Sequence, residues 1–268
     1  VSADASPPFT SLSTMVDRQY LDFNGAAATS AQRSTWLANL GNRTSTPVDL
    51  VDAAEAFPYW QKQSPIIRLF QAYFLRLPDK SGLAYWTGKS RAGKRIGEIS
   101  QQFASSSEFV RRYGTLTNRK FVEQIYVNVL GRPGDAAGIN SWTSKLDTKV
   151  KTRGEVMVGF SESSEYIRKT KEQVWTVNFF TGMLLRLPTS TEVDTWKPQS
   201  RAALITFLLG TAAYVSRVGT AAPGAAPGIT FTSLPAGRVG AAYTAPLTSS
   251  GGTGTKAWSL ASGSLPSG

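Results

Sequence analysis

Residues 121–142 read FVEQIYVNVLGRPGDAAGINSW, a pattern typical of two helices joined by a tight turn. The first half repeats apolar residues at helical spacing, which predicts one stripe facing a core: Phe121, Val122, Ile125, Tyr126, Val129 and Leu130. The segment 131–138 contains three glycines and a proline, which predicts the turn. Ile139 and Trp142 then indicate the apolar face of a second helix.

This pattern recurs along the chain, with a tryptophan sixteen positions after another aromatic residue. The four pairs are Tyr20 with Trp36, Phe70 with Trp86, Tyr126 with Trp142, and Phe180 with Trp196. Such repetition indicates one small unit copied four times. We predict a mainly α fold, an array of four short-helix repeat units, followed by a partial β-sandwich (immunoglobulin-like) segment. The eight aromatic residues are the expected anchors of the units, and sugar stacking is the alternative role of the tryptophans.

The predicted boundaries divide the chain into seven segments. They are an N-terminal extension at 1–13, helical units 1 to 4 at 14–63, 64–116, 117–171 and 172–218, a Pro/Ala/Gly linker at 219–228, and a partial immunoglobulin-like β module at 229–268. Ser64 and Pro65 predict the start of unit 2, because serine caps helices and proline suits a first turn. Units 1 and 4 depart most from the repeat, as expected of end units that cap an open stack.

The 268 residues include no cysteine and no histidine. Disulfides, the usual zinc sites and cysteine or histidine mechanisms are therefore excluded. Glu155, Glu162 and Glu165 stand at predicted helix starts, where acidic residues are favoured, so that a catalytic carboxylate pair is the weaker interpretation. We predict no enzyme, no catalytic residue, no metal site and no cofactor. Polar residues interrupt the longest apolar run, 202–215, which predicts no membrane span.

Positive charge is concentrated in unit 2. Residues 61–120 carry 12 basic and 3 acidic side chains, whereas residues 1–60 carry 3 basic and 6 acidic ones. Such a field attracts polyanions, and a merely solvated face is the alternative. No fingerprint of a nucleic-acid-binding fold accompanies the charge, which disfavours nucleic acid as the partner. The candidate basic binding surface comprises Lys89, Arg91, Lys94, Arg95, Arg111, Arg112, Arg119 and Lys120.

An arginine recurs six positions after the first aromatic residue of units 2, 3 and 4, as Arg76, Arg132 and Arg186. These arginines could bind an anionic ligand. The favoured interpretation is structural, because an arginine near a helix C-terminus can satisfy carbonyl groups and pair with an acid of its own unit.

The stretch 121–142, with LDTKVKTRGEVMVGFSESSEY at 146–166, resembles the bacterial domain-of-unknown-function family numbered 4214. The matching residues are Arg132, Asp135, Gly138, Trp142, Phe160, Ser163, Glu165 and Tyr166 in unit 3, and Arg76, Pro78, Asp79, Gly82, Leu83, Trp86, Phe103, Glu108 and Phe109 in unit 2. Its members resemble the phycobilisome linker domain and occur in secreted, cell-surface and S-layer-type proteins. The tail 229–268 resembles immunoglobulin-like modules of bacterial surface proteins, which serve as spacers or adhesive domains. These resemblances imply an exported location and bring no established active site.

We therefore expect a non-enzymatic, exported structural or scaffold protein of a bacterial cell surface, extracellular layer or filament. Self-assembly would join the acidic unit 1 of one copy to the basic unit 2 of the next, so the expected partners are further copies or other surface components. The alternative is a carbohydrate- or polyanion-binding module that targets a larger surface protein, with an acidic polysaccharide as its ligand.

Overall fold

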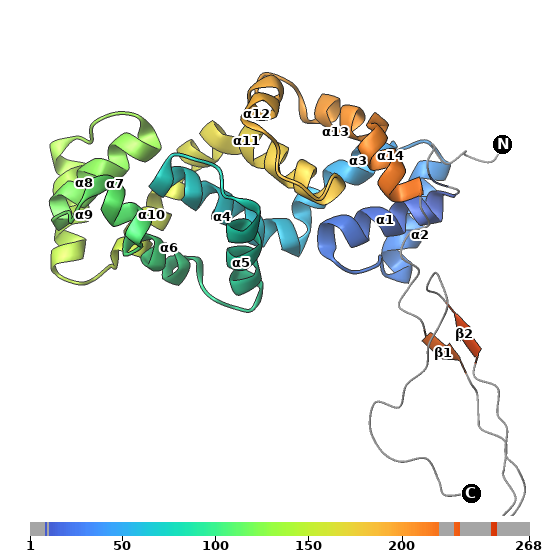
Figure 1. The fold of residues 1–268 in the computed structure, drawn as a ribbon, viewed down its shortest axis with the longest axis horizontal. Helices are drawn as coiled ribbons and strands as arrows, with labels where there is room; N and C mark the ends of the chain where they lie inside the picture. Colours follow the sequence, from blue (N-terminus) through green and yellow to red (C-terminus); the bar gives the residue numbers. More distant parts are fainter. Residues whose placement is uncertain (1–8, 10, 220–227, 231–247, 251–268) are drawn as a thin grey trace, which may run out of the picture.

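A computed structural model describes residues 9, 11–219, 228–230 and 248–250. The helices of this part form an elongated body (Figure 1). Most of the predicted extension 1–13 and of the linker 219–228 lies outside the described residues. Among the residues that are described, no helix combines the length and the apolar character needed to cross a bilayer.

Each predicted unit contributes several short helices. In unit 1 they are α1 (Leu12–Asn24), α2 (Ser30–Gly41), α3 (Pro47–Asp52) and the 3₁₀ turn η1 (Ala53–Ala56). Unit 2 has α4 (Pro58–Phe74), α5 (Lys80–Arg91), α6 (Ile96–Ala104) and α7 (Ser107–Tyr113). Unit 3 has α8 (Asn118–Ile125), the π-type turn η2 (Tyr126–Leu130), α9 (Ala136–Asp147) and α10 (Arg153–Ser161). Unit 4 has α11 (Ser164–Met183), α12 (Ser190–Trp196), α13 (Arg201–Gly210) and α14 (Ala212–Gly219).

Capping side chains set the starts of these helices. Asp79 Oδ1 accepts a hydrogen bond of 2.8 Å from the Gly82 amide at the start of α5. Asp135 and Gly138 repeat this bond at the same length at the start of α9. Ser106 caps α7 as its sequence position predicts. The turns of units 2 and 3 are therefore built in the same way.

The predicted boundaries at 63/64 and 171/172 each fall inside a continuous helix, so the helix start predicted at Ser64 and Pro65 is wrong. The helix α4 passes through Pro65 without a break, and α11 runs from Ser164 to Met183. A proline removes one helical hydrogen bond, here the bond to the carbonyl of Gln61. Since Gln61 is exposed, water can meet that carbonyl, and the proline φ suits the helix. Each long helix thus joins the end of one unit to the start of the next.

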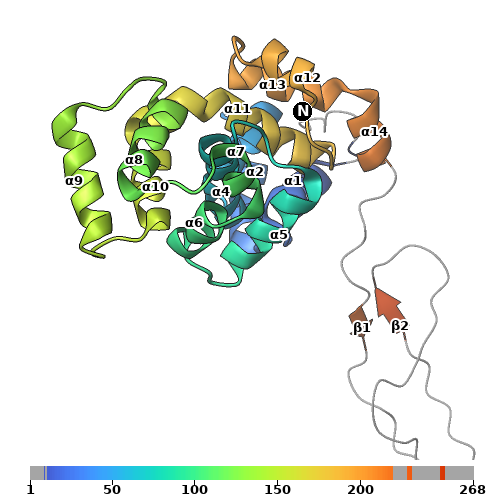
Figure 2. The same ribbon diagram turned by 60° about the vertical axis from the view of Figure 1, so that its left-hand side comes forward.

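The helices pack into two lobes, each built from two units. The lobe that we call 2–3 has a core that combines residues of units 2 and 3, beginning at Ile66, with Val174 and Val177 of α11. The lobe that we call 1–4 has a core that combines Phe23, Val51 and Trp60 with residues 179–218. Blue and orange helices lie together at one end of the body, and green helices occupy the other (Figures 1 and 2). A smaller core lies within unit 1.

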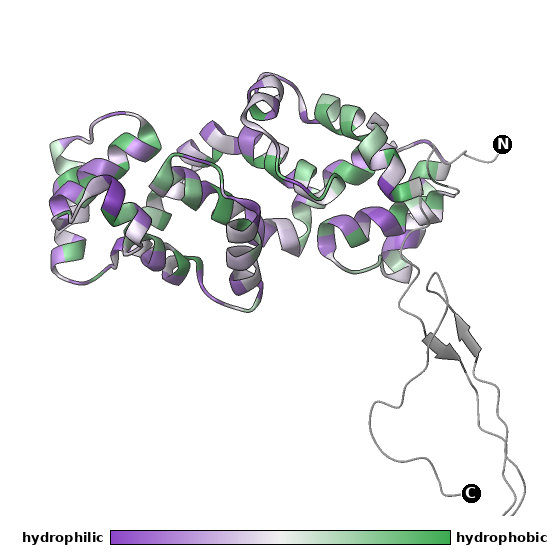
Figure 3. Ribbon diagram, in the orientation of Figure 1, coloured by the Kyte–Doolittle hydropathy of each residue, from purple (hydrophilic) through white to green (hydrophobic). Residues whose placement is uncertain are grey.

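This arrangement corrects the prediction that units 1 and 4 cap the two ends of an open stack. Phe23 of α1 packs edge-on against Phe179 of α11 with ring centroids 6.3 Å apart, and Tyr214 of α14 is fully buried. The end units have apolar faces of their own, coloured green on α13 in Figure 3. Burying them against each other removes that surface from water, which a solvated cap would not do.

The helices α4 and α11 connect the lobes, since each contributes to both cores. Trp60 at the start of α4 belongs to lobe 1–4, and residues 66–74 belong to lobe 2–3. Between the lobes the two helices are joined by polar contacts. Gln63 Nε2 donates to Asn178 Oδ1 at 2.9 Å, and Gln71 Nε2 donates to Gln173 Oε1 at 2.7 Å.

The anchor residues divide into buried and peripheral groups. Tyr20, Phe70, Tyr126 and Phe180 are buried, as expected of core anchors. The four repeat tryptophans are only half-buried, at the edges of the cores. Three of them rest on phenylalanine rings with centroids 4.9–5.4 Å apart: Trp86 on Phe103, Trp142 on Phe160, and Trp196 on Phe207. The largest fully buried side chain among the described residues is instead Trp60, outside the repeat pattern.

The predicted immunoglobulin-like β-sandwich is also corrected. Beyond the helices, the described residues form a two-stranded antiparallel ribbon, β1 (Gly228–Thr230) and β2 (Thr248–Ser250), with Ile229 opposite Ser249. A sandwich requires two sheets with apolar faces, and two strands of three residues provide neither. The remaining residues of 229–268 lie outside the described part of the chain.

Candidate interaction surface

Two of the predicted basic residues lie against aromatic rings near the end of α5. The Lys89 ammonium lies 5.3 Å from the centroid of Tyr85, whose surface is 56% exposed. The Arg91 guanidinium lies 4.9 Å from the centroid of Tyr59 on α4. Both cations are exposed, so their rings hold them in place while they remain available to a partner.

The turn from α5 to α6 contains two more of them. Arg95 donates to Glu98 Oε1 at 2.8 Å, and this pairing lowers the pKa of Glu98. The neighbouring charge of Lys94 lowers the same pKa further. Since the Arg95 guanidinium pairs with Glu98, its charge is largely compensated, whereas Lys94 forms no salt bridge within the described residues.

The other four predicted residues lie on α7 and at the start of α8. Arg112 donates to the carbonyl of Phe74 at 2.8 Å and thereby closes the end of α4. Arg119 and Lys120 both pair with Glu123, at 3.1 and 2.9 Å. The helix α8 lies near the left end of the body in Figure 1, whereas α5 lies below its middle. Of these four cations, Arg111 alone makes no ion pair or hydrogen bond through its side chain within the described residues.

Unit 3 adds cations that the sequence prediction missed. The helices α6 and α10 cross closely, because a Cβ at Gly154 would lie only 2.4 Å from the Gly97 carbonyl oxygen. A groove of about 610 Å³ opens at this crossing, and Arg95 and Lys151 both line it. The α9–α10 turn of unit 3 therefore lies beside the α5–α6 turn of unit 2.

Three lysines lie at the α9–α10 turn: Lys145 near the end of α9, then Lys149 and Lys151. The Lys145 ammonium lies 4.3 Å from the centroid of Trp142. The signal for these lysines was the repeat itself, because they follow Trp142 as the basic residues of unit 2 follow Trp86. We call the combined set the cationic rim. Its members, which form no salt bridge within the described residues, are Lys89, Arg91, Lys94, Lys145, Lys149 and Lys151. Arg111 lies on α7, outside these two turns.

The acidic residues of unit 1 are held within the molecule. Asp22 pairs with Arg18 and also with Arg217 of unit 4. Arg201 of unit 4 pairs with Asp52 and Glu55. Asp17 pairs with Arg33, and Asp49 caps α3. Among the described acids of unit 1, four of five therefore already have an arginine partner in the same chain.

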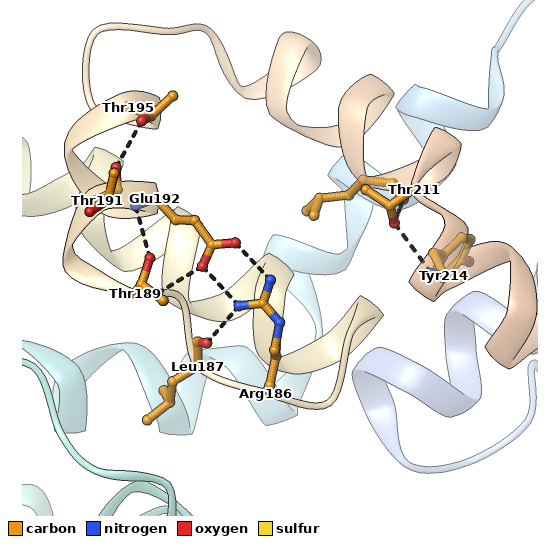
Figure 4. A network of polar contacts seen from close by, with 9 residues as sticks. Arg186, Leu187, Thr189, Thr191, Glu192, Thr195, Thr211 and Tyr214 are labelled. Carbon is orange, nitrogen blue, oxygen red and sulfur yellow. Dashed lines mark hydrogen bonds and ion pairs between the residues drawn. The ribbon is translucent and has the colours of Figure 1, made fainter.

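The recurring arginine is structural in units 2 and 4. Arg186 lies 5.0 Å from the Phe180 centroid and donates two hydrogen bonds to Glu192, of 2.8 and 2.7 Å (Figure 4). It also donates to the carbonyl of Leu187. The bond to Arg186 lowers the pKa of Glu192 to about 2.

Arg76 reaches the same arrangement with a different acid. It lies 5.3 Å from the Phe70 centroid and donates two bonds of 2.9 Å to Glu108 of α7. These bonds raise the pKa of Arg76 and lower that of Glu108. Arg132, the equivalent in unit 3, is exposed and forms no ion pair within the described residues.

The carboxylates considered as an acid–base pair lie at separate structural sites. Glu155 accepts a hydrogen bond of 2.8 Å from the Thr152 amide in the capping box of α10, which lowers its pKa. Glu162 forms a two-bond pair with Arg68 of α4. Glu165 lies in the first turn of α11. No cluster of three potential metal-ligating side chains occurs among the described residues.

One part of the chain is similar to a known protein family. Residues 100–170 match the family described as Domain of unknown function (DUF4214). The match covers the end of α6, α7, the helices of unit 3 and the start of α11. Neither the curated proteins nor the solved structures yielded a match.

Proposed function

We propose that the protein is a non-enzymatic structural or scaffold component of a bacterial cell surface or extracellular layer, and that it assembles with further copies of itself. The export and surface location rest on the family resemblance of unit 3. The geometry supports the scaffold role, because the recurring polar residues of the repeat cap helices or form pairs inside the molecule. What faces outward from lobe 2–3 is the cationic rim.

The observation that carries the proposal is the contrast between units 1 and 2. Asp17, Asp22, Asp52 and Glu55 of unit 1 pair with arginines of the same chain, whereas the cations of the rim form no salt bridge within the described residues. This contrast favours a contact between copies other than the simple acidic-to-basic one that the charge distribution predicts. An outer contact that uses the rim would instead require acidic groups from another component or from elsewhere on the chain.

The test compares assembly of the wild-type chain with that of a Lys89→Glu, Lys94→Glu variant. We expect sedimentation and electron microscopy to show ordered particles of the wild type. Salt should weaken their assembly, because exposed charges are screened. Reversal of the two rim charges should abolish the particles. We omit Arg95 because it is already paired with Glu98.

A matched control reverses two exposed lysines outside the rim, Lys62→Glu and Lys197→Glu, and should assemble like the wild type. Equal assembly of the rim variant would remove the rim from the contact. A wild-type chain that stays monomeric at every concentration would contradict the scaffold proposal as a whole.

The second candidate function is binding of an acidic polysaccharide. It is favoured by Lys89 beside the exposed Tyr85, because a cation next to an aromatic face can hold both the carboxylate and the ring of a sugar acid. Salt-sensitive retention on an acidic-glycan column that is lost in Tyr85→Ala would support it. If Tyr85→Ala leaves the retention unchanged, the column binds the protein by nonspecific charge attraction, and specific polysaccharide binding is contradicted.

A further inference from the structure

Both large cores are divided between the same two halves of the chain. The N-half, residues 12–113, contributes residues 66–109 to lobe 2–3, and the C-half, residues 118–218, contributes residues 121–177. Lobe 1–4 is divided in the same way, with Phe23 to Trp60 from the N-half and residues 179–218 from the C-half. The core of each of these two lobes therefore contains residues of both halves.

The contacts between the halves are specific as well as apolar. Gln19 Nε2 donates to Tyr214 Oη at 2.7 Å, and these two residues are 195 positions apart. The notch at Gly182 receives the Phe23 ring so closely that a Cβ there would lie 2.1 Å from Phe23 Cε1. Such complementary contacts determine how an N-half packs on a C-half, and they are the same whether the two halves belong to one chain or to two.

One short segment connects the halves. It comprises residues 114–117, between the end of α7 and the start of α8, and begins at Gly114 with φ of 74°. A short connector between two complementary halves favours domain swapping, because the same contacts can form between two chains if the connector extends. The exchanged dimer has the same contacts between halves as the monomer. The equilibrium between monomer and dimer therefore depends on the connector and on protein concentration.

We propose that two copies of this protein exchange halves, so that the N-half of each packs on the C-half of the other. This inference rests on the proposed self-assembly and supplies a contact for it that needs no acidic face on unit 1. The partner is a second copy of the chain, and the surface is the divided cores of lobes 2–3 and 1–4.

The crossing of α6 and α10 provides a reporter, because the native chain has no cysteine. A Cβ built on Gly97 of the N-half lies 3.3 Å from Cγ of Glu155 of the C-half, where a cysteine sulfur would stand. That spacing suits a disulfide. Gly97→Cys and Glu155→Cys chains are unfolded together, refolded at rising concentration and then mildly oxidised.

Exchange predicts a covalent heterodimer that links Cys at 97 of one chain to Cys at 155 of the other. While dimers are scarce, a tenfold rise in concentration should raise the ratio of dimer to monomer about tenfold by mass action. In the control, Gly88→Cys replaces Gly97→Cys, because Gly88 is an exposed helical glycine with no neighbour within 4 Å. Heterodimer formation no greater than in this control overturns the inference.

A second arm separates this inference from the proposed function. The double variant Gly97→Cys, Glu155→Cys is oxidised at low concentration, which locks the halves within one chain. If copies assemble by exchange, the locked chain loses assembly and regains it on reduction. If the locked and reduced chains assemble equally, outer surfaces make the contact, so the exchange is wrong and the scaffold proposal stands. A wild-type chain that never assembles contradicts the proposed function, while the heterodimer yield still decides the exchange.

Discussion

The residue five positions after the first aromatic anchor of each repeat lies just beyond the end of a helix and has a left-handed backbone. These residues are Gly25, Leu75, Gly131 and Leu185, with φ of 72°, 52°, 72° and 55°. Glycine adopts this conformation freely, whereas a residue with a Cβ is strained there. Leu75 and Leu185 are each 52% exposed, so little burial offsets the strain.

We predict that Leu75→Gly stabilises the protein by about 0.5 kcal/mol, measured as the free energy of unfolding in urea. The relief of left-handed strain should exceed the greater chain entropy that glycine gives the unfolded state. Leu75→Ala is the matched control and should bring no gain, because it keeps the Cβ. Destabilisation by Leu75→Gly would show that the leucine side chain contributes more than its exposure indicates.

Gly182 presents the opposite case, since here the absence of a side chain is required. We predict that Gly182→Ala costs about 2 kcal/mol in unfolding free energy, because its Cβ would overlap the buried Phe23 ring. Gly88→Ala, in open space on a helix, should instead stabilise by up to about 1 kcal/mol. Partial rescue of Gly182→Ala by Phe23→Leu would locate the overlap, and a neutral Gly182→Ala would contradict this packing.

At the scale of the helices, an arginine–glutamate pair stabilises the turn after the first helix of repeats 2 and 4. Units 2 and 4 both place an arginine on an aromatic ring, but its acid comes from α7 in one and from α12 in the other. The arginine therefore lies on the same aromatic position in both units, but it pairs with a glutamate from a different helix. The sequence indicated the arginine, and the source of the acid could not be read from spacing.

This turn predicts a specific loss of stability in acid. The pKa of Glu192 is about 2 in the folded protein against an ordinary value of 4.5. Because the folded-state pKa is lowered, the pair contributes its stability above about pH 4.5 and loses it as the pH falls towards 2. Glu192→Gln should therefore show a smaller drop in the urea midpoint between about pH 5 and pH 2 than the wild type.

Arg186→Met tests the cause of that lowered pKa. It should flatten the same part of the pH profile as Glu192→Gln does, since it removes the guanidinium that stabilises the carboxylate. Profiles of both variants that run parallel to the wild type would show that other carboxylates account for the acid sensitivity.

In the whole molecule, stability depends on pairing units that are distant in the chain. The arginines of unit 4 neutralise acids of unit 1, and the cores join segments far apart in sequence. Cleavage at a protease site placed in the 114–117 connector should leave the two halves associated in gel filtration. Once separated in denaturant, each half should lack a cooperative unfolding transition, and mixing should restore it. An isolated half that unfolds cooperatively on its own would contradict the divided cores.

Much of the local structure could be predicted from sequence. Helical spacing predicted the helices, and Asp79, Asp135 and Ser106 cap three of them in the structure, because both periodicity and capping act within a few residues. Pro65 misled because a proline starts a helix far more readily than it continues one, and only its exposed neighbour Gln61 makes the interior position tolerable. Of the candidate surface, the α5–α6 turn was predicted and the adjoining α9–α10 turn was not.

Local patterns were enough to predict the helices, the buried aromatic residues of the four repeats and the excess of positive charge on unit 2. Tertiary contacts set the packing of unit 2 on unit 3 and of unit 1 on unit 4. This packing gives Asp22, Asp52 and Glu55 of unit 1 arginine partners from unit 4. The physical reason is range. Periodicity and capping act over a few residues, whereas contacts such as Gln19 with Tyr214 join positions 195 residues apart and depend on the fit of whole surfaces.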